Sequence, residues 1–194
     1  MDLPLPHKVL HLWESSTAGE TPLVQMSSPR PAHDIVLVSS TAADSELLKQ
    51  CRDVRIKVFV DEQKFPAETE IDEYDEGDLS VHYLVQILPL KEPAGVVRIV
   101  PSKMKIGRLC ILPEYRKYRF GSDLMVKAHD YLRSCMIEYE LKEASISLHA
   151  QIPVVPFYAR LGYAQVGEHF DEDGAPHQRM VLVLQPAVPT PHIG

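Results

Sequence analysis

The sequence predicts an α/β domain in which helices flank a mixed central β-sheet of about six to seven strands. Short apolar or alternating segments, typical of strands, are interrupted by segments whose apolar residues recur at helical spacing. Strands joined by short turns indicate an antiparallel meander, whereas strands joined through a helix indicate crossover connections. A chain of 194 residues is long enough to bury a core of this kind.

The first half of the chain opens with a segment of low periodicity. Residues 1–32 are rich in Pro, Ser and Thr, so we expect an N-terminal extension ahead of a domain of residues 33–186. A helix is predicted over residues 44–63 from the spacing of its apolar positions, with Asp44 or Ser45 able to cap its first turn. The strands predicted in this half cover residues 34–40, 81–88, 94–100 and 105–112.

The second half alternates helices and strands. Apolar residues recur on one helical face between about residues 121 and 138. A short helix is expected to begin near Pro153 and to end before Gly162, because proline suits a first helical turn. The remaining strands are predicted over residues 144–150, 163–170 and 180–185, with the turn DEDGAPH joining the last two and a tail at 187–194.

The negative charge of the chain is concentrated in one stretch. Residues 61–78, DEQKFPAETEIDEYDEGD, hold nine carboxylates and one lysine, a local charge of −8, against −7 for the whole chain. The other residues together are therefore near neutrality, and no basic stripe favours a nucleic-acid partner. A solvated loop is the simplest interpretation of most of these carboxylates.

Several further features bear on location. No apolar run reaches the roughly 18 residues of a membrane-spanning helix, so no membrane association is expected. The N-terminus lacks the basic-then-apolar order of a secretory signal. Three cysteines in apolar surroundings indicate reduced thiols rather than a disulfide framework. We expect a cytoplasmic protein, with the nucleus as an open alternative, and no metal site, since no Cys or His pair has ligand spacing.

Positive charge gathers at one turn, in RLCILPEYRKYRFGSDLM at residues 108–125. An apolar strand ends at Pro113, and three cations precede Gly121 and the start of a helix. A helix N-terminus exposes unpaired backbone N–H groups and the positive end of the helix dipole. Glycine allows a ligand to approach the backbone closely. The segment therefore predicts an anion site suited to phosphate, although a plain cluster of surface cations would look similar.

Two motifs in this region resemble the GNAT superfamily of acyl-CoA-dependent N-acetyltransferases. EYRKYRFGSDLM is similar to motif A, whose Arg/Gln-x-x-Gly-x-Gly/Ala turn holds the pyrophosphate of coenzyme A, and Arg119 replaces its first glycine. QIPVVPFYARLGY, residues 151–163, is similar to motif B. Three further stretches are similar to the ElaA-like branch of this superfamily, namely VRIKVFVDEQKFPAETEIDEYD, LHAQ and FDEDGAPHQRM. The resemblance covers roughly residues 34–185 and implies a GNAT fold.

The same resemblance implies acetyl-CoA as cofactor and names the residues that would bind it. Strand residues would pair with the pantetheine arm, one N–H would polarise the thioester carbonyl, and the turn would hold the pyrophosphate. The cofactor-binding residues implied in this way are Leu109, Cys110, Ile111, Arg116, Lys117, Tyr118, Arg119, Phe120, Gly121, Ser122, Gln151, Phe157 and Tyr158.

Acetyl transfer needs a neutral amine near attack distance and a proton for the thiolate that leaves. By the resemblance, Tyr158 would supply that proton, although a core aromatic residue is the alternative role. The general base is left open among Glu70, His82 and His177, with His149 a weaker candidate, because a histidine accepts a proton near neutral pH and a carboxylate needs its pKa raised. A covalent acyl-cysteine on Cys110 is disfavoured for want of a partner base.

The acidic stretch is expected to wall the acceptor site and to attract an amine. The substrate-binding candidates are Glu62, Glu70, Asp72, Asp75, His82 and His177. The preferred function is acetylation of a primary amine on a small molecule such as an amino sugar, polyamine or arylamine, by direct attack in a ternary complex. Acetylation of a polypeptide N-terminus or lysine, and a non-catalytic acyl-CoA-binding module, are the alternatives. The protein is expected to act as a monomer or homodimer.

Overall fold

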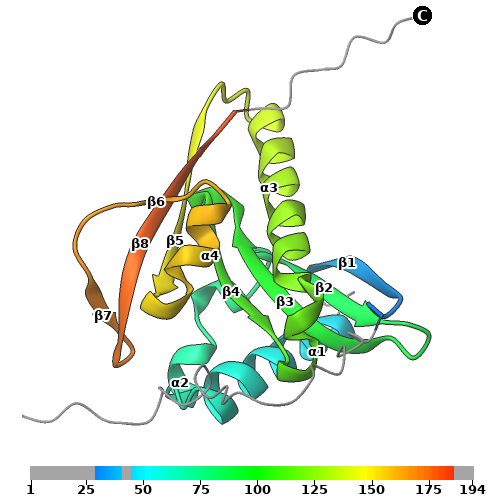
Figure 1. Ribbon diagram of the computed structural model, residues 1–194. Helices are drawn as coiled ribbons and strands as arrows, with labels where there is room; N and C mark the ends of the chain where they lie inside the picture. The colour runs from blue at the N-terminus through cyan, green and yellow to red at the C-terminus, as the bar shows by residue number, and fades with distance from the viewer. Residues whose placement is uncertain (1–28, 41–44, 186–194) are drawn as a thin grey trace, which may run out of the picture. The chain divides into compact units, whose positions relative to one another are not determined.

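The computed structural model describes residues 29–40 and 45–185, and these form one mixed sheet with helices on both faces (Figure 1). The strands are β1 (His33–Ser39), β2 (Val81–Ile87), β3 (Glu92–Val100), β4 (Lys105–Ile111), β5 (Ala144–Gln151), β6 (Ala164–Gln165), β7 (Phe170–Glu172) and β8 (Ala175–Leu184). The α-helices are α1 (Ser45–Arg55), α2 (Ala67–Glu70), α3 (Phe120–Glu138) and α4 (Val155–Arg160). Shorter helical turns are η2 (Ile56–Glu62), η3 (Glu73–Asp75), η4 (Pro101–Lys103), η5 (Pro113–Tyr118) and η6 (Ile152–Val154).

The sheet has eight strands in the order β1-β2-β3-β4-β5-β8-β6, with β7 paired to β8. Adjacent strands are antiparallel except β4 and β5, which are parallel and pair only at Lys105 and Ser147. The predicted α/β class with a mixed sheet is therefore confirmed. Short connections join β2, β3 and β4, the longer connection from β1 to β2 holds α1, and the parallel step at β4–β5 follows from the crossover through α3.

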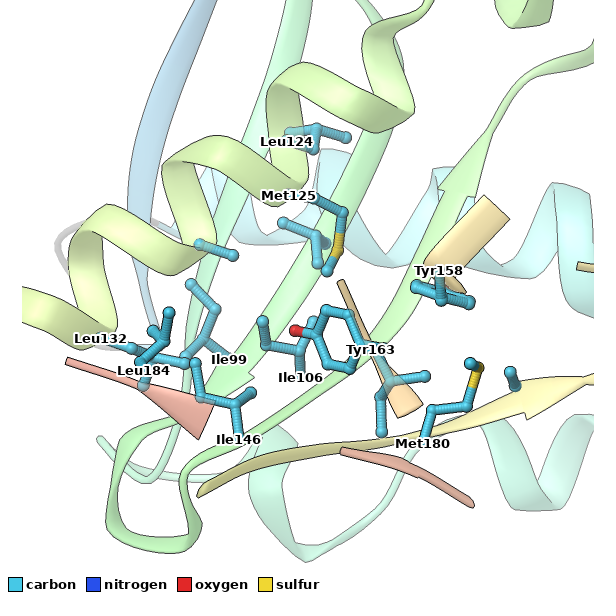
Figure 2. Packing of buried hydrophobic residues seen from close by; sticks show 14 of the residues in the cluster. Ile99, Ile106, Leu124, Met125, Leu132, Ile146, Tyr158, Tyr163, Met180 and Leu184 are labelled. Carbon is cyan, nitrogen blue, oxygen red and sulfur yellow. The ribbon is translucent and has the colours of Figure 1, made fainter. Parts of the chain in front are cut away.

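Two helices cover opposite faces of the sheet. On one face, α3 packs Leu124 and Met125 against strand residues such as Ile99 and Ile106, and Figure 2 shows Met125 directed toward Ile106. On the other face, α1 buries a second cluster that includes Val54 of the helix. Neighbouring residues of β3 point to opposite faces, and the strand is buried on both sides from Ala94 to Val100, with Arg98 as the one charged residue in that stretch.

The structure corrects the predicted elements at three places. The predicted strand 163–170 forms only in part: Ala164–Gln165 pair as β6 and Phe170 begins β7, while Gly162 and Gly167 adopt left-handed backbone angles of φ 91° and 76°. The predicted turn 171–177 instead holds the end of β7, a tight turn at Gly174 and the start of β8. The predicted helix 44–63 changes after Arg55 into η2.

Some predictions fall on parts of the chain that the structure does not describe. The N-terminal extension is outside the described residues except at its last positions, as are the tail 187–194 and the proposed cap Asp44.

Candidate active site

The site begins where β4 and β5 separate. These parallel strands share one paired position, Lys105 with Ser147, and β4 then continues to Ile111 without further pairing to β5. On its other side β4 is bonded to β3, with a bulge that leaves Arg108 at φ 50°. The backbone of residues 109–111 therefore has one edge that no described strand covers, and an extended ligand can bond to it as an added strand would.

A cavity of about 970 Å³ lies beside this free edge. It is bounded by β4, the turn before α3, and α4. The implied cofactor residues that line it are Leu109, Cys110, Ile111, Arg116, Arg119, Gly121, Ser122, Phe157 and Tyr158. Segments separated by about 40 residues in the sequence thus meet in one concave space, as the two motifs require.

The first turn of α3 forms one end of this cavity. Gly121 and Ser122 line the cavity at the positive end of a 19-residue helix, which favours an anion. Arg119 occupies the residue before the helix with a left-handed φ of 62°, a conformation that glycine adopts far more readily. Arg160 of α4, which the sequence analysis did not single out, adds a further cation to the lining.

Arg116 is engaged by a carboxylate. Its Nη1 and Nη2 atoms lie 2.8 and 2.5 Å from the two carboxylate oxygens of Glu62, and its Nε donates to the Ile111 carbonyl. Glu62 therefore lies beside the larger cavity through its ion pair with Arg116 and lines neither of the two cavities at this site, although the sequence analysis placed it at the acceptor site.

Four of the implied cofactor residues lie elsewhere. Phe120 is fully buried in the core, Tyr118 packs on its ring, and the Lys117 ammonium lies 5.0 Å from the Tyr118 ring centre. Gln151 lines the neighbouring cavity and donates from Nε2 to the Gln63 side chain. The side chains of these four residues therefore do not line the larger cavity.

A second cavity of about 250 Å³ adjoins the first. It is lined by the acidic segment, by β4 and β5, and by the β7–β8 turn. The two cavities share three lining residues, namely Leu109, Val154 and Tyr158. These three residues therefore border both cavities and mark where the two adjoin.

Tyr158 borders both cavities at this junction. Only 8% of the surface of Tyr158 is exposed. This burial raises the pKa of the phenol, and Cys110 makes a smaller contribution in the same direction. A raised pKa keeps the hydroxyl protonated at neutral pH. Burial also raises the pKa of the Cys110 thiol. It therefore disfavours the thiolate that covalent catalysis needs.

The acidic segment is held by three arginines that the sequence analysis overlooked. Arg55 bonds to Glu70 and Asp75, Arg98 bonds to Asp72 and Asp75, and Arg108 reaches Glu70 and Asp72. Three guanidinium charges thus offset these three carboxylates. The predicted attraction of an amine by Glu70, Asp72 and Asp75 is therefore not supported by their surroundings, and Asp75 is buried without lining either cavity.

The structure separates the two histidines that were expected to share a cleft. His82 is fully buried next to Arg55 and lines neither cavity, so its predicted position is wrong. Burial, followed by the nearby Arg55 charge, lowers the pKa of His82 to about 3. His177 does line the smaller cavity, where its Nδ1 lies 2.9 Å from the Ala175 carbonyl.

His149 and Glu172 form a pair in the smaller cavity that the sequence analysis did not anticipate. The imidazole Nδ1 is 3.0 Å from both carboxylate oxygens. This hydrogen bond is the main reason that the pKa of Glu172 is lowered from its ordinary value of 4.5. Asp173 also lines this cavity. The available signal was the alternation of β5, which places His149 on the opposite face from Leu148 and Ala150.

Comparison with known proteins identifies the class. A family model described as "Acetyltransferase (GNAT) domain" matches residues 47–184, so the chain belongs to the GNAT acetyltransferase family. Members of this fold family bind acyl-CoA. Within the described residues, no helix is both long and apolar enough to cross a membrane.

Individual relatives agree with this assignment. The chain is 35% identical over 144 residues to the "Uncharacterized N-acetyltransferase YjcF" of Bacillus subtilis (strain 168), covering 72% of this chain and 95% of the relative. Escherichia coli ElaA superimposes with a TM-score of 0.63 at 27% identity, over 77% of this chain and 99% of that chain. An acyl-CoA N-acyltransferase from Pseudomonas aeruginosa gives a TM-score of 0.63 at 26% identity, with the same coverage. The resemblance to the GNAT superfamily and its ElaA-like branch is therefore confirmed.

Proposed function

We propose that this protein is an acetyl-CoA-dependent N-acetyltransferase that acetylates a primary amine on a small molecule by direct attack in a ternary complex. The observation that carries the proposal is the junction of the two cavities at Leu109, Val154 and Tyr158. A direct transfer needs donor and acceptor to meet at one point with a proton donor beside them. Membership of the GNAT family supports acyl transfer as the reaction. The shared border of the two cavities supports a direct transfer between two bound molecules.

The residues of the larger cavity fit an acyl-CoA. Arg119, Arg160 and the first turn of α3 would hold the phosphates, and Arg116 would join them on leaving Glu62. The free edge of β4 at residues 109–111 would bond to the pantetheine amides and polarise the carbonyl to be attacked. The bound acyl-CoA would supply the acetyl group as a thioester.

Tyr158 would donate its phenolic proton to the sulfur that leaves. Because its pKa is raised, Tyr158 keeps its proton at neutral pH and can deliver it to the sulfur as negative charge develops there. The high pKa of the Cys110 thiol supports direct attack by the amine over a covalent acyl-cysteine.

The size of the smaller cavity supports a compact acceptor. At about 250 Å³ it is slightly smaller than the usual range for small-molecule sites, which is roughly 300–1,000 Å³. The acidic segment forms a wall of this cavity through residues such as Thr69, Glu70 and Tyr74. Since arginines anchor that wall, we expect it to stay in place and to restrict bulky acceptors.

A thiol-release assay tests this proposal. The purified full chain is mixed with acetyl-CoA and with amino sugars, polyamines, arylamines and short peptides, and free CoA is measured over time. We expect release above background with at least one small amine and weak release with peptides. Preferential release with peptides would contradict the small-molecule class. Saturable acetyl-CoA binding without release by any amine would contradict the enzyme and favour a binding module.

A further inference from the structure

His149 and Glu172 come from different strands and meet on one wall of the smaller cavity. His149 is on β5 and Glu172 is the last residue of β7, and both line this cavity together with Tyr158. The His149 side chain is about 30% exposed, so its ring is accessible from the cavity. Phe170 packs edge-on against the ring, with 4.9 Å between ring centres and an interplanar angle of 76°. The imidazole is thus held both by a carboxylate and by an aromatic ring.

The carboxylate fixes which ring nitrogen carries the proton. An ionised carboxylate only accepts hydrogen bonds, so Nδ1 of His149 must donate to Glu172, and in the neutral ring Nε2 keeps its lone pair. We propose that His149 is the general base of the acetyl transfer, with Nε2 taking the proton of the attacking amine, and that Glu172 is its positioning residue. This inference rests on the proposed function and adds the proton acceptor to it.

The other candidate bases in this region are less suitable. Both carboxylate oxygens of Glu70 are within ion-pair distance of guanidiniums, from Arg55 and Arg108. His82 lines neither cavity and stays neutral to low pH. His177 donates from Nδ1 to a neutral carbonyl, which stabilises an imidazolium less than the carboxylate of Glu172 does.

The proposed step is balanced in protons. The amine nitrogen forms a bond to the carbonyl carbon while its proton moves to Nε2 of His149, and the carbon–sulfur bond breaks as the sulfur takes a proton from Tyr158. One proton leaves the amine and one reaches the thiol, so no oxidant, reductant or further reactant is needed. Proton exchange with solvent then returns His149 and Tyr158 to their starting forms.

Four other charged or titratable groups surround the pair. Lys105 of β4 and His177 of β8 lie close enough to Glu172 to help lower its pKa. Arg179 is opposite His149 on β8 and is exposed, and Asp173 follows Glu172 in the turn. Of the charged groups near His149, Glu172 bonds directly to the ring and would stabilise its positive charge. Removal of Glu172 should therefore make His149 harder to protonate.

The test compares H149N and E172Q with the matched controls H169N and E168Q, which change exposed residues that line neither cavity. With acetyl-CoA and the best amine of the thiol-release panel, H149N should lower kcat/KM by about 10²–10⁴-fold and remove the acidic limb of the pH–rate profile. E172Q should lower kcat/KM by about tenfold or more and move that limb to lower pH. The acetyl-CoA Kd should be unchanged in both variants, which separates chemistry from folding.

A second measurement needs no acceptor. The imidazole of His149 is followed by NMR through a pH titration and is assigned by its absence in H149N. The pair predicts a lower titration midpoint in E172Q and no change in E168Q; an unchanged midpoint in E172Q would overturn the positioning role. Retention of kcat/KM within threefold in H149N would overturn the base role. If the wild-type chain releases no thiol with any amine, the proposed function and with it the base role fail, while the titration still decides the His149–Glu172 pair.

Discussion

The guanidinium of Arg55 is bonded to the carboxylate of Asp75, and neither side chain has any exposed surface. Arg55 is the last residue of α1, and Asp75 is the last residue of η3 in the acidic segment, 20 residues later. Asp75 also receives hydrogen bonds from Arg98 and from the backbone N–H of Asp72, which closes the turn η3. This buried pair therefore ties the acidic segment to the sheet and fixes one wall of the smaller cavity.

The first prediction concerns this anchor. Asp75→Asn leaves Arg55 and Arg98 with an uncompensated buried charge, so we expect the free energy of unfolding to fall by about 3–5 kcal/mol. Chemical denaturation at pH 7 measures it. Asp78→Asn makes the same charge change at an exposed position and should have an effect within about 0.5 kcal/mol. Equal effects of the two substitutions would show that the buried pair adds no stability.

The same anchor makes stability depend on pH. Arg55 and Arg98 lower the pKa of Asp75 from its ordinary 3.8, with burial opposing them, so the carboxylate binds a proton more readily in the unfolded chain. Its contribution is therefore complete above about pH 4 and is lost as the pH falls toward the lowered folded value. Denaturation between pH 5 and pH 2 should show a steeper decline for the wild type than for Asp75→Asn. Parallel curves would contradict this assignment.

A third prediction concerns the pair of Arg116 and Glu62. Both side chains are partly exposed, so the ion pair contributes about 0.2–1 kcal/mol. Glu62→Gln frees Arg116 and should therefore tighten acetyl-CoA binding about two- to fivefold at low salt. Calorimetric titration measures the change. Glu114→Gln removes an exposed acid from the same turn and should tighten binding less. The gain should vanish when Arg116 is also replaced by Ala; a gain that survives would mean that Glu62 acts through another group.

The fourth prediction concerns the left-handed backbone of Arg119, where one substitution should raise stability and weaken acetyl-CoA binding. Arg119→Gly should raise the free energy of unfolding by about 1 kcal/mol, because glycine adopts φ 62° without strain. It should also weaken acetyl-CoA binding about tenfold through loss of a cation beside the phosphates. Lys91→Gly, at a φ of 58° outside both cavities, should give the stability gain alone. Unchanged affinity in Arg119→Gly would assign no phosphate contact to this side chain.

The sequence was most informative where the signal is local. Apolar spacing located α3, and the run of cations before Gly121 located the turn that borders the larger cavity. Both signals come from residues that are close together in the sequence. The same reasoning succeeded only in part at residues 163–170, where a β-like composition was overridden by two glycines with positive φ.

The acceptor side depends on contacts that are distant in the sequence. Arg98 interrupts an apolar central strand, a position where a charge is costly unless it is paired, and this was the available hint of a buried ion-pair cluster. Its partners Asp72 and Asp75 lie 23 to 26 residues away. His149 and Glu172 likewise meet only because β5, β8 and β7 are adjacent in the sheet, so the sequence alone offered no way to join them.

The junction of the two cavities at Tyr158 is tested most directly by Tyr158→Phe. The substitution removes the phenolic oxygen and preserves the ring that packs on Phe157 and Tyr163. The measurement is kcat for thiol release with acetyl-CoA and the best amine of the panel, with acetyl-CoA Kd as the control. We predict a loss of about 10²–10⁴-fold in kcat with an unchanged Kd, because the leaving thiolate loses its proton donor. A kcat within threefold of the wild type would contradict the account and make Tyr158 a packing residue.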